Sequence, residues 1–284
     1  MRGLFVGLIT LDCVYQVHHV PEANEKTVAQ DSWLGAGGPA TNAAVTFSQM
    51  GNAAQVLGAL GQHPMTSLVR ADLAHHEVDV LDLSPAIADP PPLSTILVTA
   101  ATGDRAVISR NAVGRQIEPP LHYDHWLRGV DVVLVDGHQM ALGRAVATLA
   151  RQRSIPVVID AGSWKPGFET VLPLATSVIA AAKFRLPDQP TATETLQALH
   201  QMGIPEVAMT HGPDPIQLWR DGDIVELPVP AVAVTDTLGA GDIFHGAFCH
   251  YRLSHGVDTA LTLAAQVAAQ SCQQFGPRSW CKVR

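Results

Sequence analysis

Residues 236–248 read DTLGAGDIFHGAF, in which two aspartates enclose a pair of glycines and an apolar segment follows at once. Alternating Val and Ala (AVAV, residues 231–234) come just before, so the pattern places the glycines between an extended segment and a helix. Gly239 and Gly241 let the backbone turn sharply and let a ligand come close. The backbone amides of 238–242 would then point out of a helix N-terminus, which suits a phosphate or a developing oxyanion.

Asp242 stands beside this predicted anion site, where a second negative charge does not help ground-state binding. The arrangement makes sense if Asp242 is a base that removes a proton from a substrate hydroxyl, which then attacks a phosphoryl group. From this motif alone, a plain glycine turn with Asp242 as a helix-start residue stays open. The chain has no G-x-x-x-x-G-K-[ST] sequence, and the third glycine of G-x-G-x-x-G is misplaced.

A second glycine motif, GAGGPATN, occupies residues 35–42 and predicts a glycine turn that opens a helix over about 41–50. Gly37 and Gly38 would give a ligand access to the backbone. Asn42 offers both a donor and an acceptor, as a sugar hydroxyl requires. Asp12, expected at the end of the first strand, offers acceptor oxygens. An ordinary turn with a surface Asn is the alternative that this motif leaves open.

Between the two motifs, β-branched apolar runs alternate with amphipathic segments, which predicts an α/β fold with a mostly parallel sheet covered on both faces. The expected strands are 3–9, 53–60, 78–83, 131–136, 156–161, 177–181 and 206–211, with a hairpin at 215–229. The expected helices are 66–77, 141–153, 167–173, 191–202 and 258–275, besides those at the two motifs. Polar strand-like pieces at about 14–34 and 94–110 interrupt this alternation and predict a small separate sheet, a lid inserted in one domain spanning 1–284.

The composition narrows the class of protein. A net charge of −8 argues against a dedicated nucleic-acid binder. No apolar run reaches the roughly 18 residues of a membrane span. The histidines lack partners at metal-ligand spacing. The cysteines have no metal spacing and are too sparse for a disulfide scaffold, which predicts a reducing, cytoplasmic compartment; they are Cys13, Cys249, Cys272 and Cys281.

Together, the two glycine motifs resemble the signatures of the ribokinase-like (PfkB) family of carbohydrate kinases. GGPATNAAVTFSQMG (37–51) looks like the N-terminal signature, and DTLGAGDIFHGAF looks like the C-terminal one. The resemblance covers nearly the whole chain. It implies a ribokinase-like three-layer α/β/α core with a β-sheet lid that often forms a homodimer contact. It also implies transfer of the γ-phosphoryl group of ATP, with Mg²⁺, to a hydroxyl of a sugar or sugar-like substrate.

Carried over by position, the resemblance assigns roles to individual residues. Asp242 would be the catalytic base, with an anion hole formed by Gly239, Ala240 and Gly241. The acceptor would contact Asp12, Gly37, Gly38 and Asn42. The nucleotide would contact Thr210, Gly212, Asp236, Ala268, Cys272 and Gly276. His138 follows the strand-like VLVDG and is a further candidate for the acceptor site; a surface or core histidine is the alternative.

Two departures from the family pattern concern the metal and the activity. The family's Asn-x-x-Glu, whose Glu helps to organise the metal, aligns with Ala181 and Phe184. The family's G-x-D-x-x-G is replaced by GQHPMT (61–66). The leading hypothesis is therefore an ATP-dependent sugar kinase whose metal ligands are unknown. A nucleoside kinase of the same family, or a catalytically weak ligand-binding or regulatory relative, is the alternative.

Overall fold

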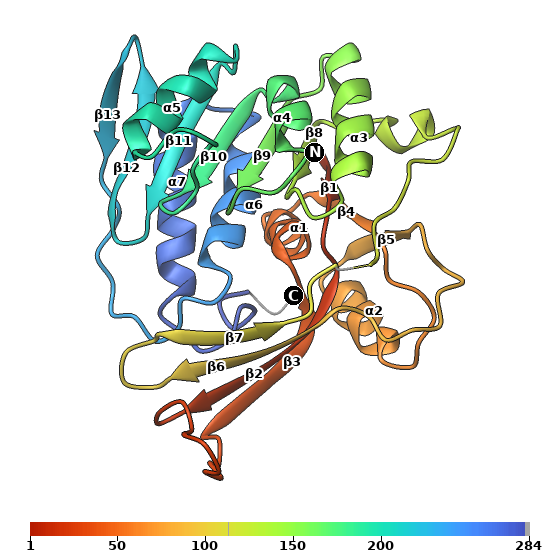
Figure 1. Cartoon of the computed structure of the whole chain (residues 1–284), viewed down its shortest axis with the longest axis vertical. Helices are drawn as coiled ribbons and strands as arrows, with labels where there is room; N and C mark the ends of the chain where they lie inside the picture. The colour runs from red at the N-terminus through yellow and green to blue at the C-terminus, as the bar shows by residue number, and fades with distance from the viewer. Residues whose placement is uncertain (113, 282–284) are drawn as a thin grey trace.

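A nine-stranded sheet forms the centre of the molecule, with the strand order β13-β12-β11-β10-β9-β8-β1-β4-β5 (Figure 1). The structure, a computed structural model, describes residues 1–112 and 114–281. The pairs from β11 through β10, β9, β8, β1 and β4 to β5 are parallel, and β12 and β13 add an antiparallel edge. The strands are β1 Arg2–Val6, β4 Ala53–Gly58, β5 Val78–Asp82, β8 Val132–Val135, β9 Val157–Ala161, β10 Ser177–Ala181, β11 Glu206–His211, β12 Asp214–Arg220 and β13 Asp223–Leu227.

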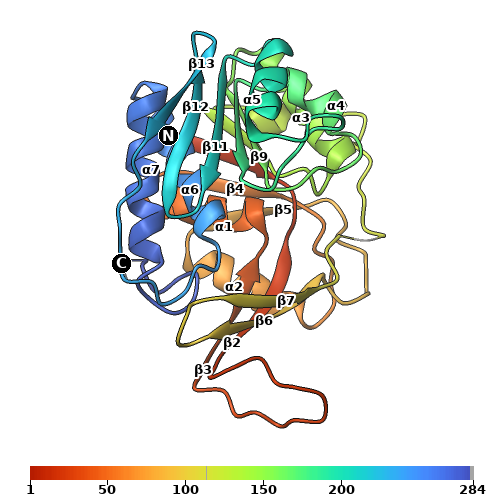
Figure 2. The same ribbon diagram turned by 60° about the vertical axis from the view of Figure 1, so that its left-hand side comes forward.

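Helices cover both faces of this sheet, as the continuous apolar strands predicted. Along β1, Leu4 and Val6 join one buried cluster, whereas Phe5 joins the other. One face carries α1 Pro39–Gln49, α2 Thr66–His75, α6 Ala240–Arg252 and α7 Val257–Ser271. The other carries α3 Met140–Gln152, α4 Phe168–Val171 and α5 Ala192–Gln201 (Figure 2). Short 3-10 turns lie at Asp124–Leu127 and Leu172–Leu174.

A second, four-stranded sheet in the order β3-β2-β6-β7 lies at the carboxyl ends of the parallel strands (Figure 1). Its strands are β2 Thr10–Val17, β3 Asp31–Gly37, β6 Leu93–Thr99 and β7 Arg105–Ser109. This confirms a small separate sheet built from the two predicted regions. Residues 18–30 form no strand, and this segment extends beyond the sheet (Figure 2).

Several predicted boundaries were wrong, and packing explains the most instructive one. Gly35 and Gly37 belong to strand β3 rather than to a turn. A Cβ atom at Gly37 would lie 1.9 Å from a carboxylate oxygen of Asp12, so glycine here makes room for that side chain. Asp12 was expected at the end of the first strand. That strand ends at Val6, and Asp12 lies inside the next strand, β2. The last helix ends at Ser271 rather than near residue 275. Within the described residues, no helix has the length and apolarity to cross a membrane.

Candidate functional site

The two glycine motifs meet at the helix pair α1 and α6. Each helix follows a glycine with positive φ, which is 103° at Gly38 and 74° at Gly239. The helices approach closely where a Cβ atom on Gly246 would lie 2.3 Å from the Ala43 carbonyl oxygen. At their N-terminal ends, Nδ2 of Asn42 donates to Oδ2 of Asp242 at 2.7 Å. The fold therefore joins the two residues singled out in motifs 200 positions apart.

The N-terminus of α6 presents free backbone donors, although fewer than the sequence suggested. The Leu238 amide donates to Oδ1 of Asp236 at 2.8 Å, and the Ala240 amide donates to the Thr237 carbonyl at 3.3 Å. Among the described residues, the amides of Gly239, Gly241 and Asp242 have no acceptor. Unpaired amides in the first turn of a helix, with the positive end of its dipole, form an anion site.

Partial burial raises the pKa of the Asp242 carboxyl group. Desolvation, and then the Asp160 carboxylate, raise the pKa of Asp242 to about 7. The Asn42 hydrogen bond and the nearby His245 and Arg105 oppose this rise. A carboxyl group whose pKa lies near the working pH is suited to accept a proton from a hydroxyl.

Asp160 and His245 were missed by the sequence analysis. Asp160 is buried near the end of β9, with Oδ2 at 3.7 Å from Nδ1 of His245. The His245 ring also contacts the Gly241 carbonyl at 2.7 Å and the Ile179 carbonyl at 3.2 Å. These contacts tie the first turn of α6 to β9 and β10. An aspartate closing the apolar run VVIDA was the available signal, because ligands gather at the carboxyl ends of parallel strands.

Asp12, which was predicted to contact the acceptor, lies in β2 and is buried. Burial raises the pKa of Asp12 to about 6, against the lowering effect of Ser94 and Arg278. Its Oδ1 atom has no hydrogen-bond partner among the described residues. A buried acceptor left unpaired is costly unless a ligand or water completes it. Asp12 therefore has the chemistry expected of a residue that accepts a hydrogen bond from a hydroxyl.

Arg278 is a further buried charge that the sequence analysis missed. It lies in the loop after α7 and is 7% exposed. Nη1 donates to Oδ1 of Asn42 at 2.9 Å, and Nη2 donates to the Ala36 carbonyl at 2.7 Å. Nε lies 3.7 Å from Oδ2 of Asp72. No pattern in the sequence around GPRSW marks this arginine as buried.

Asp136, also missed, fixes the backbone beneath the site. Its carboxylate accepts from the amides of Leu8 at 2.9 Å, Ala40 at 3.1 Å and His138 at 2.8 Å. It thus joins the ends of β1 and β8 to the first turn of α1. The candidate His138 is held here through its backbone, and its side chain makes no hydrogen bond to Asp12, Asn42 or Asp242 among the described contacts.

Three of the residues predicted to contact the nucleotide lie together in the structure. Oδ2 of Asp236 accepts from the Gly276 amide at 2.9 Å, and the Cys272 carbonyl accepts from the Asp236 amide at 3.2 Å. These bonds tie the loop after α7 to the glycine motif. Ala268 is on α7, partly buried against the core. Thr210 and Gly212 stand at the end of β11, where Oγ1 of Thr210 donates to the Ala180 carbonyl at 3.4 Å.

The positions that depart from the family pattern serve packing and loop support. Phe184 is buried, with its ring centroid 6.2 Å from that of Trp164 and 5.9 Å from that of Phe168. In the loop at 60–62, Oδ1 and Oδ2 of Asp82 accept from the amides of Leu60 and Gly61, both at 3.0 Å. Within residues 1–112 and 114–281, no three His, Cys, Asp or Glu side chains gather as a metal site.

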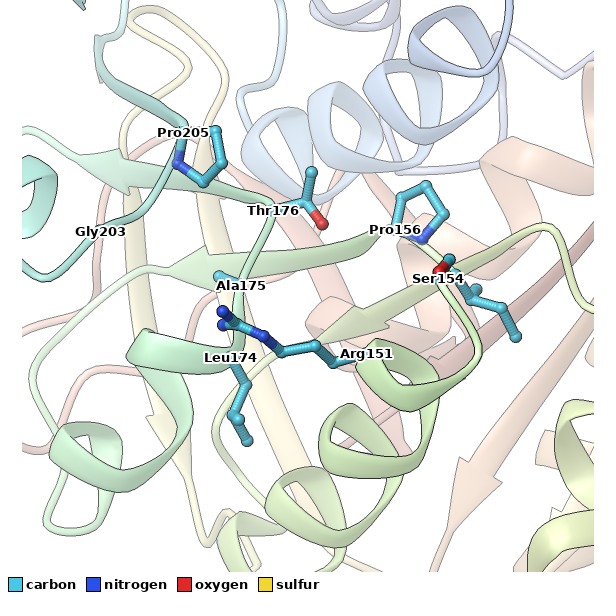
Figure 3. A pocket seen from close by; sticks show the side chains of 9 residues that line it. Arg151, Ser154, Pro156, Leu174, Ala175, Thr176, Gly203 and Pro205 are labelled. Atoms are coloured by element: carbon cyan, nitrogen blue, oxygen red, sulfur yellow. The ribbon is translucent and has the colours of Figure 1, made fainter.

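A cavity of about 250 Å³ lies at the amino ends of the strands of the main sheet, opposite the candidate site (Figure 3). Pro156, Thr176 and Pro205 line it just before β9, β10 and β11 begin. Arg151 also lines it and donates to the Pro173 carbonyl. Because Asp160 is at the other end of β9, this cavity is separate from the candidate site.

Comparison with known proteins adds an independent observation. The model of the pfkB family carbohydrate kinase matches residues 4–282. The ATP-dependent ribose-1-phosphate kinase of Halopiger xanaduensis is 25% identical, over 98% of this chain and 94% of its own. A candidate ribokinase from Agrobacterium tumefaciens has a similar structure, with a TM-score of 0.89, 27% identity and coverage of 99% and 94%. Arabidopsis thaliana ribokinase, solved with ribose and ATP, shares the fold at a TM-score of 0.77, 21% identity and coverage of 97% and 93%.

Proposed function

This chain belongs to the pfkB family of carbohydrate kinases, and we propose that it transfers the γ-phosphoryl group of ATP to a hydroxyl of a sugar or sugar-like alcohol, with Asp242 as the base. The observation that carries this proposal is the 2.7 Å contact between Asn42 and Asp242. A residue able to bind a hydroxyl thus lies beside a partly buried carboxylate, next to unpaired helix amides.

The chemistry follows from these groups. Asp12 and Asn42 hold the acceptor so that one hydroxyl points at Asp242. The carboxylate takes the hydroxyl proton while the oxygen forms a bond to the γ-phosphorus. The bond from that phosphorus to the β,γ-bridging oxygen breaks, and ADP leaves with the electron pair. The amides of Gly239, Gly241 and Asp242 stabilise the charge on the transferring group.

ATP is the phosphoryl donor in this proposal, and Mg²⁺ accompanies it. Magnesium in such sites takes most of its ligands from phosphate oxygens and water, with one or two carboxylates. Asp160 and Asp236 are the buried carboxylates near Asp242 and the glycine motif that fit this role, in place of the absent Asn-x-x-Glu. When bound, the ion neutralises phosphate charge. Asp236 is held rigid by the amides of Leu238 and Gly276.

A coupled ADP-release screen tests the proposal. The acceptors are hexoses, pentoses, sulfosugars, phosphosugars and nucleosides, each at several Mg²⁺ concentrations. We expect ADP release that depends on one group of sugars. Release with nucleosides alone favours a nucleoside kinase. Sugar binding by calorimetry without turnover at any Mg²⁺ or Mn²⁺ concentration favours a ligand-binding relative and contradicts the proposal.

We further propose that two copies of the chain associate through the outer face of the small sheet. The inner face is buried at Val14, Ile96 and Val98. Cys13, Leu34, Thr95 and Ile108 are directly paired across the strands and so form a row on the other face. Leu34 is 50% and Ile108 76% exposed. An exposed apolar row on one sheet face can pack against the same row of a second copy about a two-fold axis.

A further inference from the structure

We propose that Arg278 is a positioning residue that acts through Asn42 on the base Asp242. This inference rests on the proposed function. Nη1 of Arg278 donates to Oδ1 of Asn42 at 2.9 Å, and Nδ2 of the same amide donates to Asp242 at 2.7 Å. The three side chains therefore form one directed chain of hydrogen bonds, which starts in the loop after α7 and ends at the base.

Arg278 decides which way the Asn42 amide points. A guanidinium group has only donors, so the Asn42 atom that faces it must be the oxygen. The amide nitrogen then faces Asp242, where it donates to the carboxylate. Without the guanidinium group, the Asn42 amide can turn over so that its oxygen faces Asp242. This oxygen would repel the ionised carboxylate. A chain of hydrogen bonds in a buried setting also strengthens each member.

Arg278 is itself fixed on three sides. The Ala36 carbonyl accepts from Nη2 at 2.7 Å, Asp72 lies 3.7 Å from Nε, and the Trp33 ring centroid lies 5.5 Å from Cζ. Its Nε has no hydrogen-bond partner among the described residues. These contacts leave the guanidinium group little freedom, so it can hold the amide in one orientation.

The charged groups around both ends of this series of hydrogen bonds determine what a titration of Asp242 will detect. Asp242 is faced from β9 by Asp160, from α6 by His245, from β7 by Arg105 and from α1 by Asn42. Arg278 is close to Asp12 on β2, to Asp72 on α2 and to His76 just after α2. Removal of Arg278 thus acts on Asp242 either through Asn42 or through a general change of charge. A double-mutant cycle separates these two routes.

The experiment measures the pKa of Asp242 by carbon-13 NMR of aspartate-labelled full-length protein, with Asp242→Asn identifying the signal. We expect Arg278→Met to raise this pKa by about one unit, because a hydrogen bond to an ionised group is weakened. In an Asn42→Ala background, the same substitution should add nothing. Arg151→Met, at the remote cavity, is the matched control and should leave the pKa unchanged.

An unchanged pKa in Arg278→Met, or an equal rise in both backgrounds, overturns the inference. If the methionine variant does not fold, Arg278→Lys takes its place in the cycle. Its ammonium group keeps the charge near Asp72, and we expect a smaller rise that again vanishes with Asn42→Ala. The titration needs no substrate, so wild-type protein that phosphorylates nothing contradicts the proposed function while the pKa cycle still decides the role of Arg278.

Discussion

The side chain of Asn42 donates to Asp242 at 2.7 Å, although the two residues lie 200 positions apart. Each belongs to the first turn of a helix that begins after a positive-φ glycine. The contact thus places both helix N-termini around one point at the carboxyl ends of the parallel strands. This relationship connects the two sequence motifs to the proposed chemistry.

Replacement of Asp242 by Asn should lower acceptor-dependent ADP formation by about 10²-fold or more, because the proposed general base is lost. The amide is nearly the same size as the carboxyl group, so circular dichroism should report an unchanged fold. The measurement is kcat with the best acceptor of the ADP-release screen. Asp79→Asn, on the exposed side of β5, is the control and should keep full activity. Near wild-type turnover in Asp242→Asn would rule out Asp242 as the base.

The pH dependence of the reaction should follow the raised pKa of Asp242, which is about 7. Since the base must be ionised, kcat/KM should rise with pH through this value and then level off. Asp160→Asn removes the like charge that helps to raise the pKa of Asp242, so it should move the rise to lower pH. The measurement is a full profile of kcat/KM for both proteins. A profile that stays in place in Asp160→Asn contradicts the electrostatic coupling of the two carboxylates.

The same raised pKa predicts a pH-dependent cost in stability. The folded protein holds the Asp242 proton more tightly than the unfolded chain, in which the aspartate carboxyl group has its ordinary pKa of 3.8. The contribution to stability is therefore fully present below about pH 4 and is lost as the pH rises through about 7. Asp242→Asn removes this loss. The free energy of unfolding of the variant minus that of the wild type should therefore increase by up to about 4 kcal/mol between acid and mildly alkaline pH.

Urea unfolding of the two proteins at about pH 4.5 and about pH 8 checks this stability prediction. Asp12, whose pKa is also raised, is present in both proteins, so its contribution cancels in the comparison. A difference between mutant and wild type that does not grow with pH would show that Asp242 is not protonated in the folded state at neutral pH.

The sequence predicted the parts of this molecule that depend on periodicity and local turn chemistry. The alternation of apolar runs and helices yielded the two-sided sheet, and the glycines at 38 and 239 marked the helix starts. Arg278 and Asp136 are different, because their roles depend on partners that only tertiary packing supplies. Gly37 shows the same limit, since the need for glycine there comes from the Asp12 side chain.

Arg105 should couple the small sheet to the proposed phosphoryl-transfer site. It lies on β7, and its Nη1 donates to the Thr237 carbonyl at 2.6 Å, while Oγ1 of Thr237 donates to the Gly103 carbonyl at 3.4 Å. We expect Arg105→Met to lower kcat by roughly 10- to 10²-fold through misplacement of the glycine loop. It should also raise the share of ATP hydrolysed without acceptor, because water gains access.

The matched control for this effect is Arg144→Met, an exposed arginine on α3. Both variants are assayed for phosphorylated acceptor and for ADP, so that the ratio of the two products measures wasted ATP. Equal ratios in Arg105→Met and in the wild type would mean that the small sheet does not exclude water through this contact.

Association through the small sheet should depend on its exposed apolar row. Ile108 is 76% exposed on the outer face, paired through Thr95 with Cys13 and Leu34. Ile108→Asp places a charge at one end of the proposed apolar contact, on the edge strand β7, where the carboxylate would lose water without gaining a partner. Light scattering coupled to size-exclusion chromatography should report the mass of two chains for the wild type and of one chain for this variant. Leu121→Asp, at a leucine that is 94% exposed outside the sheet, is the control and should stay a dimer. A monomeric wild type, or a dimeric Ile108→Asp, contradicts this interface.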